Sequence, residues 1–298
     1  MVDASAQADI RGLDIDRMVR GFADEELILK PYLLNNKTSS REIRYFVKTA
    51  GFLDSPDTTG ITASQIITSS KSLPVVAEPS WTRASAFVKA FKVESPWISN
   101  EDIADNDVDM WATAARDLAR AVANQVDIRC YDVLADKVTS VPGDGGNVPT
   151  GGAVADGWDD TATGDPVTDF LTAQNSIRSY RYKPQNSVAY MHSDDYKNLV
   201  NWIINVKGSS MPALVDRLIS GGVLMNFLKT DIVVSNNATT DYVVFFVPQV
   251  SASWKSFMPI KSYVIDEPGI AKKIRVVEEG EAILHDPNSV YVLSDTQV

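Results

Sequence analysis

The longest regular pattern of apolar and polar residues lies between residues 106 and 137 and predicts one long helix. Its apolar residues recur close to every 3.6 positions, at Met110, Ala114, Leu118, Ala121, Val122, Val126, Val133 and Leu134. Asp107 can cap the first turn, and no glycine or proline follows before Pro142. Thirty helical residues extend about 45 Å, and a single apolar stripe predicts a sheet or loop packed along one side rather than a helix bundle.

The half of the chain that follows alternates between loop, helix and strand patterns. A loop rich in glycine, aspartate and threonine is expected at 141–165, and helices are predicted at 166–180, 195–206 and 212–219. Short strands are predicted at 187–191, 231–235 and 242–247. The last sixty residues are rich in strand patterns, in the stretches KSYVIDEPG, KIRVVEEGEAILHD and SVYVLSD. This mixture predicts an α+β fold.

The first hundred residues look too thin to fold alone. Residues 43–52 and 81–98 read as extended, and the polar tract TTGITASQIITSSKSLP separates them, which predicts a two-stranded ribbon with a polar tip. Residues 1–40 form an arm with scattered apolar positions, and Pro31 interrupts its densest apolar patch, 27–34. Because an isolated ribbon is marginally stable in water, both segments are expected to need a packing partner.

The composition of the chain excludes several classes of function. The formal charge of -11 argues against binding DNA or RNA by neutralising phosphates. The single cysteine, Cys130, rules out an intrachain disulfide and favours a reducing compartment. No apolar run approaches the length of a membrane span, and residues 1–20 lack the apolar core of a signal peptide.

The residues that could carry chemistry favour structural roles, and we predict no catalytic residue, metal or cofactor. His192 and His285 lie in turn patterns, and Cys130 lies mid-helix, where a buried thiol is expected. The glycine-rich loop lacks the ending of a phosphate-binding loop, and DGWDDTATGD lacks the spacing of a calcium loop. The glutamates at 278–281 are interpreted as a turn at a strand end, and the six tryptophans as core or interface anchors.

Five weak motifs in one order resemble a known family. After the arm and ribbon, ISNEDIADNDVDMW leads into the long helix, a glycine-rich loop follows, and then a helix, RYKPQNSVAYMHSDDYKNL and a second helix. Within that stretch Tyr182 and Pro184 form a turn, 187–191 a short strand, and Ser193-Asp194 open the helix. Over residues 41–298 this order is similar to the major capsid proteins of tailed phages, which have the Hong Kong 97-type fold.

The resemblance implies a layout in five segments. They are the N-terminal arm, 1–40; the E-loop ribbon and entry to the peripheral (P) domain, 41–99; the P-domain spine helix and its following loop, 100–150; mainly the axial (A) domain, 151–255; and return strands of the P-domain sheet, 256–298. Many relatives begin with a long scaffolding segment that is later removed. Since this chain starts almost at the arm, we expect a separate scaffolding protein, or a processed chain.

The resemblance also implies where copies of the chain meet. The arm is expected to dock on neighbouring subunits through an apolar cluster, Leu27, Ile28, Leu29, Leu33 and Leu34, and the ribbon to overlap an adjacent subunit near its tip, at Lys71. Some relatives join an E-loop lysine to a neighbour's asparagine. Lys71 and Asn288 are of the right types, but we interpret Lys71 as an ordinary solvated or salt-bridging lysine.

The function that the resemblance implies is self-assembly into an icosahedral shell around a double-stranded DNA viral genome. The implied partners are copies of the chain in pentamers and hexamers, a separate scaffolding protein and a portal. A decoration protein is compatible with such a shell, and no membrane is involved. The implied location is the virion, after assembly in the host cytoplasm. Two alternatives stay open: an encapsulin-type protein nanocompartment, and a soluble α/β enzyme whose site is not evident from the sequence.

Overall fold

The computed structural model describes residues 16–23, 26–50, 70–73, 80–101, 107–135, 150–180, 182–184, 186–207 and 226–297. The chain divides into two compact units. The first unit comprises Met1–Ile43, Phe87–Cys130 and Trp254–Ala282, and the second comprises Arg44–Ala86, Tyr131–Ser253 and Ile283–Val298. The predicted helix at 212–219 and most of the predicted ribbon tip lie outside the described residues.

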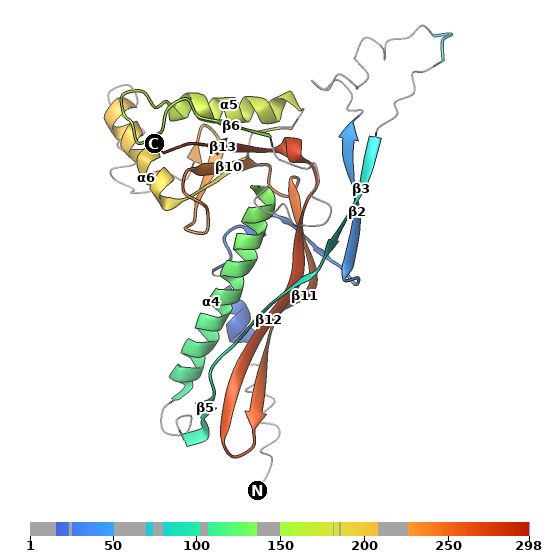
Figure 1. Cartoon of the computed structure of the whole chain (residues 1–298), viewed down its shortest axis with the longest axis vertical. Helices are drawn as coiled ribbons and strands as arrows, with labels where there is room; N and C mark the ends of the chain where they lie inside the picture. The colour runs from blue at the N-terminus through green and yellow to red at the C-terminus, as the bar shows by residue number, and fades with distance from the viewer. Residues whose placement is uncertain are drawn as a thin grey trace. The chain divides into compact units, whose positions relative to one another are not determined.

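A long helix and a five-stranded sheet build the first unit. The helix α4 (Asp107–Leu134) confirms the prediction from periodicity. The sheet has the order β1 (Leu34–Lys37), β11 (Ala252–Glu267), β12 (Ala271–Leu284) and β4 (Lys89–Glu94), and β5 (Ile98–Ser99) also pairs with β12. Within this unit α4 runs alongside the β11–β12 hairpin (Figure 1), so its apolar stripe meets a sheet, as its single stripe predicts.

The glutamates at 278–281 lie inside a strand, which corrects their interpretation as a turn. Glu278, Glu279 and Glu281 are 1%, 7% and 0% exposed in the middle of β12. Gly280 lets the ring of Trp254 lie against the strand, because a Cβ atom at position 280 would come within 2.3 Å of the Trp254 Cζ2 atom. A run of charged residues in a sequence suggests an exposed turn. In the structure these side chains lie inside the strand and act as buried ion-pair partners.

The extended pattern at 81–98 divides between the ribbon and another sheet. The strands β2 (Glu42–Ala50) and β3 (Ser80–Phe87) form a two-stranded sheet, as expected. The extended pattern of 81–98 does not continue along this ribbon, because β4 pairs antiparallel with β12 in the first unit, with Val93 opposite Val276. One apolar-rich run in the sequence therefore serves two different sheets.

A six-stranded mixed sheet forms the framework of the second unit. Its order is β6 (Thr150–Ala153), β13 (Val290–Ser294), β10 (Tyr242–Phe246), β7 (Val188–Met191), β9 (Thr230–Val234) and β8 (Asn226–Phe227). β6 runs parallel to β13 and β7 parallel to β9, whereas the other pairs are antiparallel. The prediction of a loop throughout 141–165 was wrong at β6, and 141–149 lies outside the described residues.

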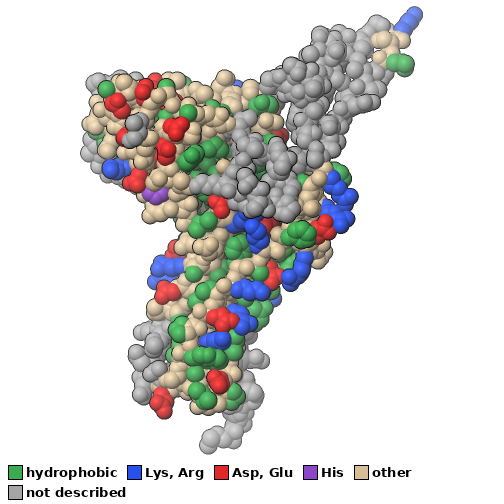
Figure 2. Space-filling view, in the orientation of Figure 1, with side chains coloured by type: hydrophobic (Ala, Val, Ile, Leu, Met, Phe, Trp, Pro, Cys, Tyr) green, Lys and Arg blue, Asp and Glu red, His purple; other side chains and the backbone are tan. Residues whose placement is uncertain are grey.

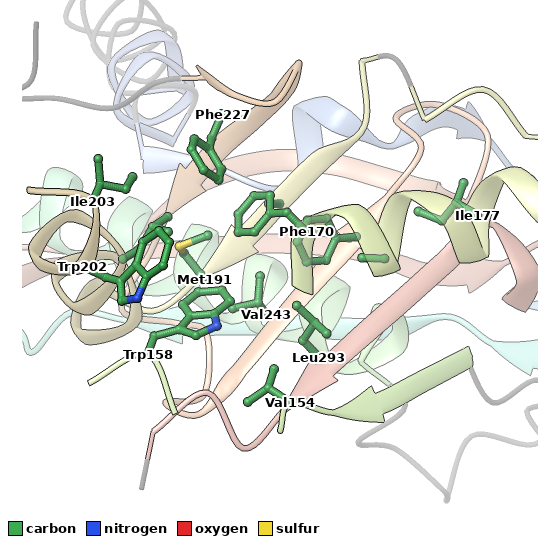
Figure 3. Close-up of a cluster of buried hydrophobic side chains, with 14 residues drawn as sticks. Val154, Trp158, Phe170, Ile177, Met191, Trp202, Ile203, Phe227, Val243 and Leu293 are labelled. Carbon is green, nitrogen blue, oxygen red and sulfur yellow. The ribbon is translucent and has the colours of Figure 1, made fainter. Parts of the chain in front are cut away.

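Two helices complete the second unit close to their predicted positions. α5 (Pro166–Ser179) begins after Asp165, whose side chain accepts a hydrogen bond from the Thr168 backbone N–H and caps the helix as predicted. α6 (Ser193–Lys207) begins at the predicted Ser193-Asp194 pair. The core of this unit gathers Trp158, Trp202 and Phe170 (Figure 3), and the Phe170 ring meets the rings of Phe227 and Phe245 edge-on at 5.1 and 4.8 Å.

The last strand lies in a different sheet from the one expected. The prediction places 256–298 as return strands of the sheet beside the spine helix, but β13 pairs with β10 and β6 in the second unit. Residues after β13 stay in that unit too, since the Trp158 backbone N–H donates to the Thr296 carbonyl at 2.8 Å. Among the described helices, none is long and apolar enough to cross a membrane.

Candidate assembly surfaces

A buried carboxylate of α4 anchors the arm within its own chain. Asp127 has no exposed surface and accepts three hydrogen bonds from successive backbone N–H groups, those of Ile28 at 2.6 Å, Leu29 at 3.2 Å and Lys30 at 3.1 Å. These groups open the short 3-10 helix η1 (Lys30–Tyr32) and lack helical partners of their own. Burial raises the pKa of the Asp127 carboxyl above its ordinary value, and the three hydrogen bonds act in the opposite direction.

Ion pairs tie the same part of the arm and α4 to β12. The Lys30 ammonium pairs with Glu278 and lies 5.3 Å from the centre of the Trp254 ring. The Arg129 guanidinium donates to Glu281 Oε1 at 2.7 Å. Burial raises the pKa of Glu281, while its pairing with Arg129 lowers it. Arm, helix and strand are thus connected by charges that are almost completely removed from water.

The apolar cluster of the arm divides into buried and exposed residues, which corrects the expectation that all of it docks on a neighbour. Leu29 is 0% and Leu33 is 4% exposed within the first unit, because the Asp127 anchor places this segment against α4. Ile28 and Leu34 remain 36% and 41% exposed, and Leu27 is partly buried. Only the exposed members keep a large apolar surface for a neighbouring copy.

The arm also covers an edge of the sheet. β1 pairs with β11, and the Thr38 backbone N–H donates to the Ser256 carbonyl at 2.9 Å. Further along β11, the Ser262 backbone N–H donates to Asp16 Oδ1 at 3.0 Å. Because open strand edges invite pairing with other chains, the arm protects β11 from unwanted contacts.

One surface of the strands β4, β12 and β11 carries a shallow depression of about 250 Å³. Its lining is mixed in chemistry and consists of Lys92, Met258, Tyr263, Arg275, Val277 and Glu279. Glu279 lies between Arg41 at 3.4 Å and Lys92 at 3.9 Å. Figure 2 shows Lys, Arg, Asp and Glu side chains interspersed with apolar ones over this unit. The charged groups of this depression are therefore engaged in ion pairs within the unit.

Exposed large apolar side chains occur on both units. In the first unit they include Trp97, Tyr263, Val264 and Ile270, which are 40–63% exposed. On the ribbon Phe46 is 65% exposed, and near the predicted ribbon tip Leu73 is 90% exposed. Lys71 is also exposed, and its predicted role in an intersubunit contact stays a prediction. Phe46 was not among the contact residues predicted from the sequence. Its position in a ribbon of two strands could have identified it, because few residues of such a ribbon can cover its side chain.

The residues that could carry chemistry are placed for structural work. Cys130 is buried, and burial raises the pKa of its thiol well above the ordinary value. His192 Nδ1 accepts the Asp194 backbone N–H at 3.1 Å at the start of α6, as expected of a turn histidine. Within the described ranges, no cluster of three or more His, Cys, Asp or Glu side chains could hold a metal ion.

Known proteins match this chain at the level of a family and of a fold. A family model for phage capsid proteins matches residues 97–278. The chain shares its fold with a virus-like particle from Pyrococcus furiosus, at 11% identity and TM-score 0.62 over 95% of this chain and 99% of that one. It also resembles the capsid of cyanophage P-SCSP1u, at 14% identity and TM-score 0.62 over 88% and 86%. A Mycobacterium phage Che8 structure matches at 17% identity and TM-score 0.59 over 91% and 92%.

A comparison with curated protein sequences gave no match. The structural matches confirm the Hong Kong 97-type fold that the order of motifs predicts. The family match is independent of them and runs from Trp97, beside β5, to Glu278 in β12. Because this match spans more than half of the 298 residues, the chain belongs to the phage capsid protein family.

Proposed function

We propose that many copies of this capsid protein assemble into a closed icosahedral shell that encloses a double-stranded DNA viral genome. The observation that carries the proposal is the family match over residues 97–278. The exposed apolar side chains support it, because Phe46 and Leu73 have no cover within the described chain and a neighbouring copy would supply it. The net charge of -11 suits a container that must not hold its DNA tightly.

The contacts in such a shell follow from the exposed parts of each unit. The ribbon β2–β3 overlaps an adjacent copy through Phe46 and the region of Lys71, and the arm adds Ile28 and Leu34. The second unit meets its copies in pentamers and hexamers. A separate scaffolding protein and a portal take part in assembly in the host cytoplasm, a decoration protein is compatible with the finished shell, and the product is the virion capsid.

The protein acts as a structural component rather than as an enzyme. Cys130 is sealed inside the first unit, so its thiolate is not available as a nucleophile. The depression on the first unit combines Lys92, Arg275 and Glu279, but Glu279 is engaged with Arg41 and Lys92. Its groups therefore serve ion pairing, which fits a protein contact.

A protein nanocompartment is the second candidate, because the chain shares its fold with a virus-like particle from Pyrococcus furiosus. The shells of the two candidates enclose different molecules. Shells purified after assembly in the host should protect double-stranded DNA from added nuclease if the chain forms a viral capsid. Shells that consistently hold a protein cargo and no nuclease-protected DNA would favour the nanocompartment.

The variant Phe46→Ser tests the ribbon contact that the proposal requires. Phe46 is 65% exposed in the subunit, so the change should leave subunit melting nearly unaltered while shell formation falls sharply. Sedimentation separates subunits from shells, and Phe46→Leu, which keeps an apolar side chain, should largely restore assembly. Normal shells from Phe46→Ser would contradict the ribbon contact.

A further inference from the structure

The buried charges where the arm meets α4 and β12 are unbalanced. Asp127, Glu278 and Glu281 are all at most 1% exposed, and among the described residues two buried or partly buried cations, Lys30 and Arg129, pair with Glu278 and Glu281. Arg129 is paired with Glu281, so Lys30 of the arm faces both Asp127 and Glu278. With every group ionised, the cluster carries one uncompensated negative charge.

The hydrogen bonds do not remove this excess. The backbone N–H groups of the arm satisfy Asp127, but Glu278 Oε2 and Glu281 Oε2 are buried without a hydrogen-bond partner among the described residues. A buried, unpaired carboxylate charge is far more costly than a neutral acid in the same place. One bound proton restores the neutrality of the cluster.

A further cation, Lys89 of β4, also acts on this cluster. In the described elements packed there, the titratable and charged groups that act on this cluster include Lys30 of the arm, Asp127, Arg129 and Cys130 of α4, Glu278 and Glu281 of β12, and Lys89 of β4. Lys89 is exposed, so water screens its charge, and burial keeps the Cys130 thiol neutral.

We propose that the cluster is a proton-dependent clamp on the arm: docking of the arm traps one proton among the buried carboxyl groups, so the arm is held more tightly as the pH falls. The arm is the moving part, because it brings Lys30 and the three N–H groups that Asp127 binds. Undocking admits water to Asp127, the carboxyl group that the arm covers, and the proton is released.

The direction of the pH effect follows from linkage. Burial raises the pKa of Asp127, the carboxyl group that the arm covers, above its ordinary 3.8, and this effect outweighs the hydrogen bonds from the arm. An acid with a higher pKa in the docked state binds a proton on docking. The arm is therefore held most tightly below the ordinary pKa of Asp127, and the hold weakens as the pH rises through the raised pKa of this group.

Hydrogen–deuterium exchange of the arm amides measures this hold without any mutation. We expect protection of residues 28–33 in the full chain, corrected for the intrinsic pH dependence of exchange, to fall as the pH rises through the raised pKa of Asp127, by up to about tenfold per pH unit within the titration range. Pre-assembled shells and free subunits are measured separately. Protection that is constant or rises over this range would overturn the proposal.

The variant Glu278→Gln separates a proton clamp from ordinary packing. It removes the excess charge while leaving an oxygen for Lys30 and all three bonds to Asp127, so the pH dependence of arm protection should largely disappear. The matched control is Glu94→Gln on the same sheet, whose partners Lys273 and Arg275 lie outside the cluster, and it should keep the wild-type slope. An unchanged slope in Glu278→Gln would contradict the clamp.

Discussion

At the scale of single residues, Gly280 marks a place in β12 where no side chain fits. A Cβ atom there would lie 2.3 Å from Trp254 Cζ2 and 3.0 Å from the Lys255 carbonyl oxygen. Because Trp254 is fully buried, its ring cannot move aside cheaply. The close fit joins β11 to β12 at the centre of the first unit.

We predict that Gly280→Ala lowers the free energy of unfolding by about 1–3 kcal/mol through overpacking. Gly21→Ala is the matched control, since a Cβ atom at Gly21, within the helical segment 16–23, meets nothing within 4 Å. The control should be neutral or stabilising by up to about 1 kcal/mol. Urea denaturation of subunits compares the two variants, and equal effects would contradict the tight fit.

Burial also separates two leucines of the arm. Leu29→Ala should destabilise the subunit by about 2–5 kcal/mol, because Leu29 is 0% exposed. Leu34→Ala should cost about 1 kcal/mol or less, because Leu34 is 41% exposed, and its effect should appear in assembly instead. Chemical denaturation and sedimentation give the two readouts. A stability loss at Leu34 equal to that at Leu29 would be inconsistent with this division.

Glu94 provides a pH dependence of opposite sign to the clamp. Hydrogen bonds from Lys273 and then Arg275 lower the pKa of Glu94 below its ordinary 4.5, so its pairing stabilises the fold above that value and is lost as the pH falls through the lowered pKa. The stability difference between wild type and Glu94→Gln should therefore shrink on acidification. Denaturation at neutral pH and at about pH 3 measures it, and a difference that grows in acid would refute the pairing.

At the scale of elements, local patterns predicted the helices well and the strand partners poorly. The 3.6-residue period of α4 and the Asp165 cap of α5 are properties of neighbouring residues, so the sequence displays them directly. β6 was missed because its Gly151-Gly152 pair resembles a loop. A Cβ atom at either glycine would come within 3 Å of an atom of β13, which lies about 140 residues away in the chain.

The arm was misjudged for the same reason. Its anchor, Asp127, is 97–99 residues from the N–H groups that it binds, and no local pattern connects them. Exposure of the remaining apolar residues, Ile28 and Leu34, likewise depends on the docked position of the arm. Candidate contact residues can therefore be sorted only once the tertiary structure is known.

The ribbon offers a test at the same scale. Lys71 is exposed, and the polar tract 54–71 has little apolar content to hold it on its own subunit. We expect trypsin to cut early at Lys71 in free subunits and slowly in assembled shells. Mass spectrometry identifies the cleavage site, and cleavage at Lys37 serves as an internal reference. Equal rates at Lys71 in both states would remove the claim that the ribbon contacts a neighbour.

At the scale of the whole molecule, each copy contributes two folded units, a thin ribbon and exposed apolar side chains that its own described residues leave uncovered. A contact worth a few kcal/mol per copy is repeated around the entire shell, so modest local energies produce a strongly cooperative assembly. The family match, the fold and these surfaces all lead to the same central claim, that the chain builds a closed shell.

Electron microscopy of the purified full-length chain, alone and after co-expression with a scaffolding protein, tests this claim most directly. We expect closed icosahedral particles tens of nanometres across, with the β2–β3 ribbon of one copy resting on the next. A chain that stays monomeric under every condition, with scaffold and without, would contradict it.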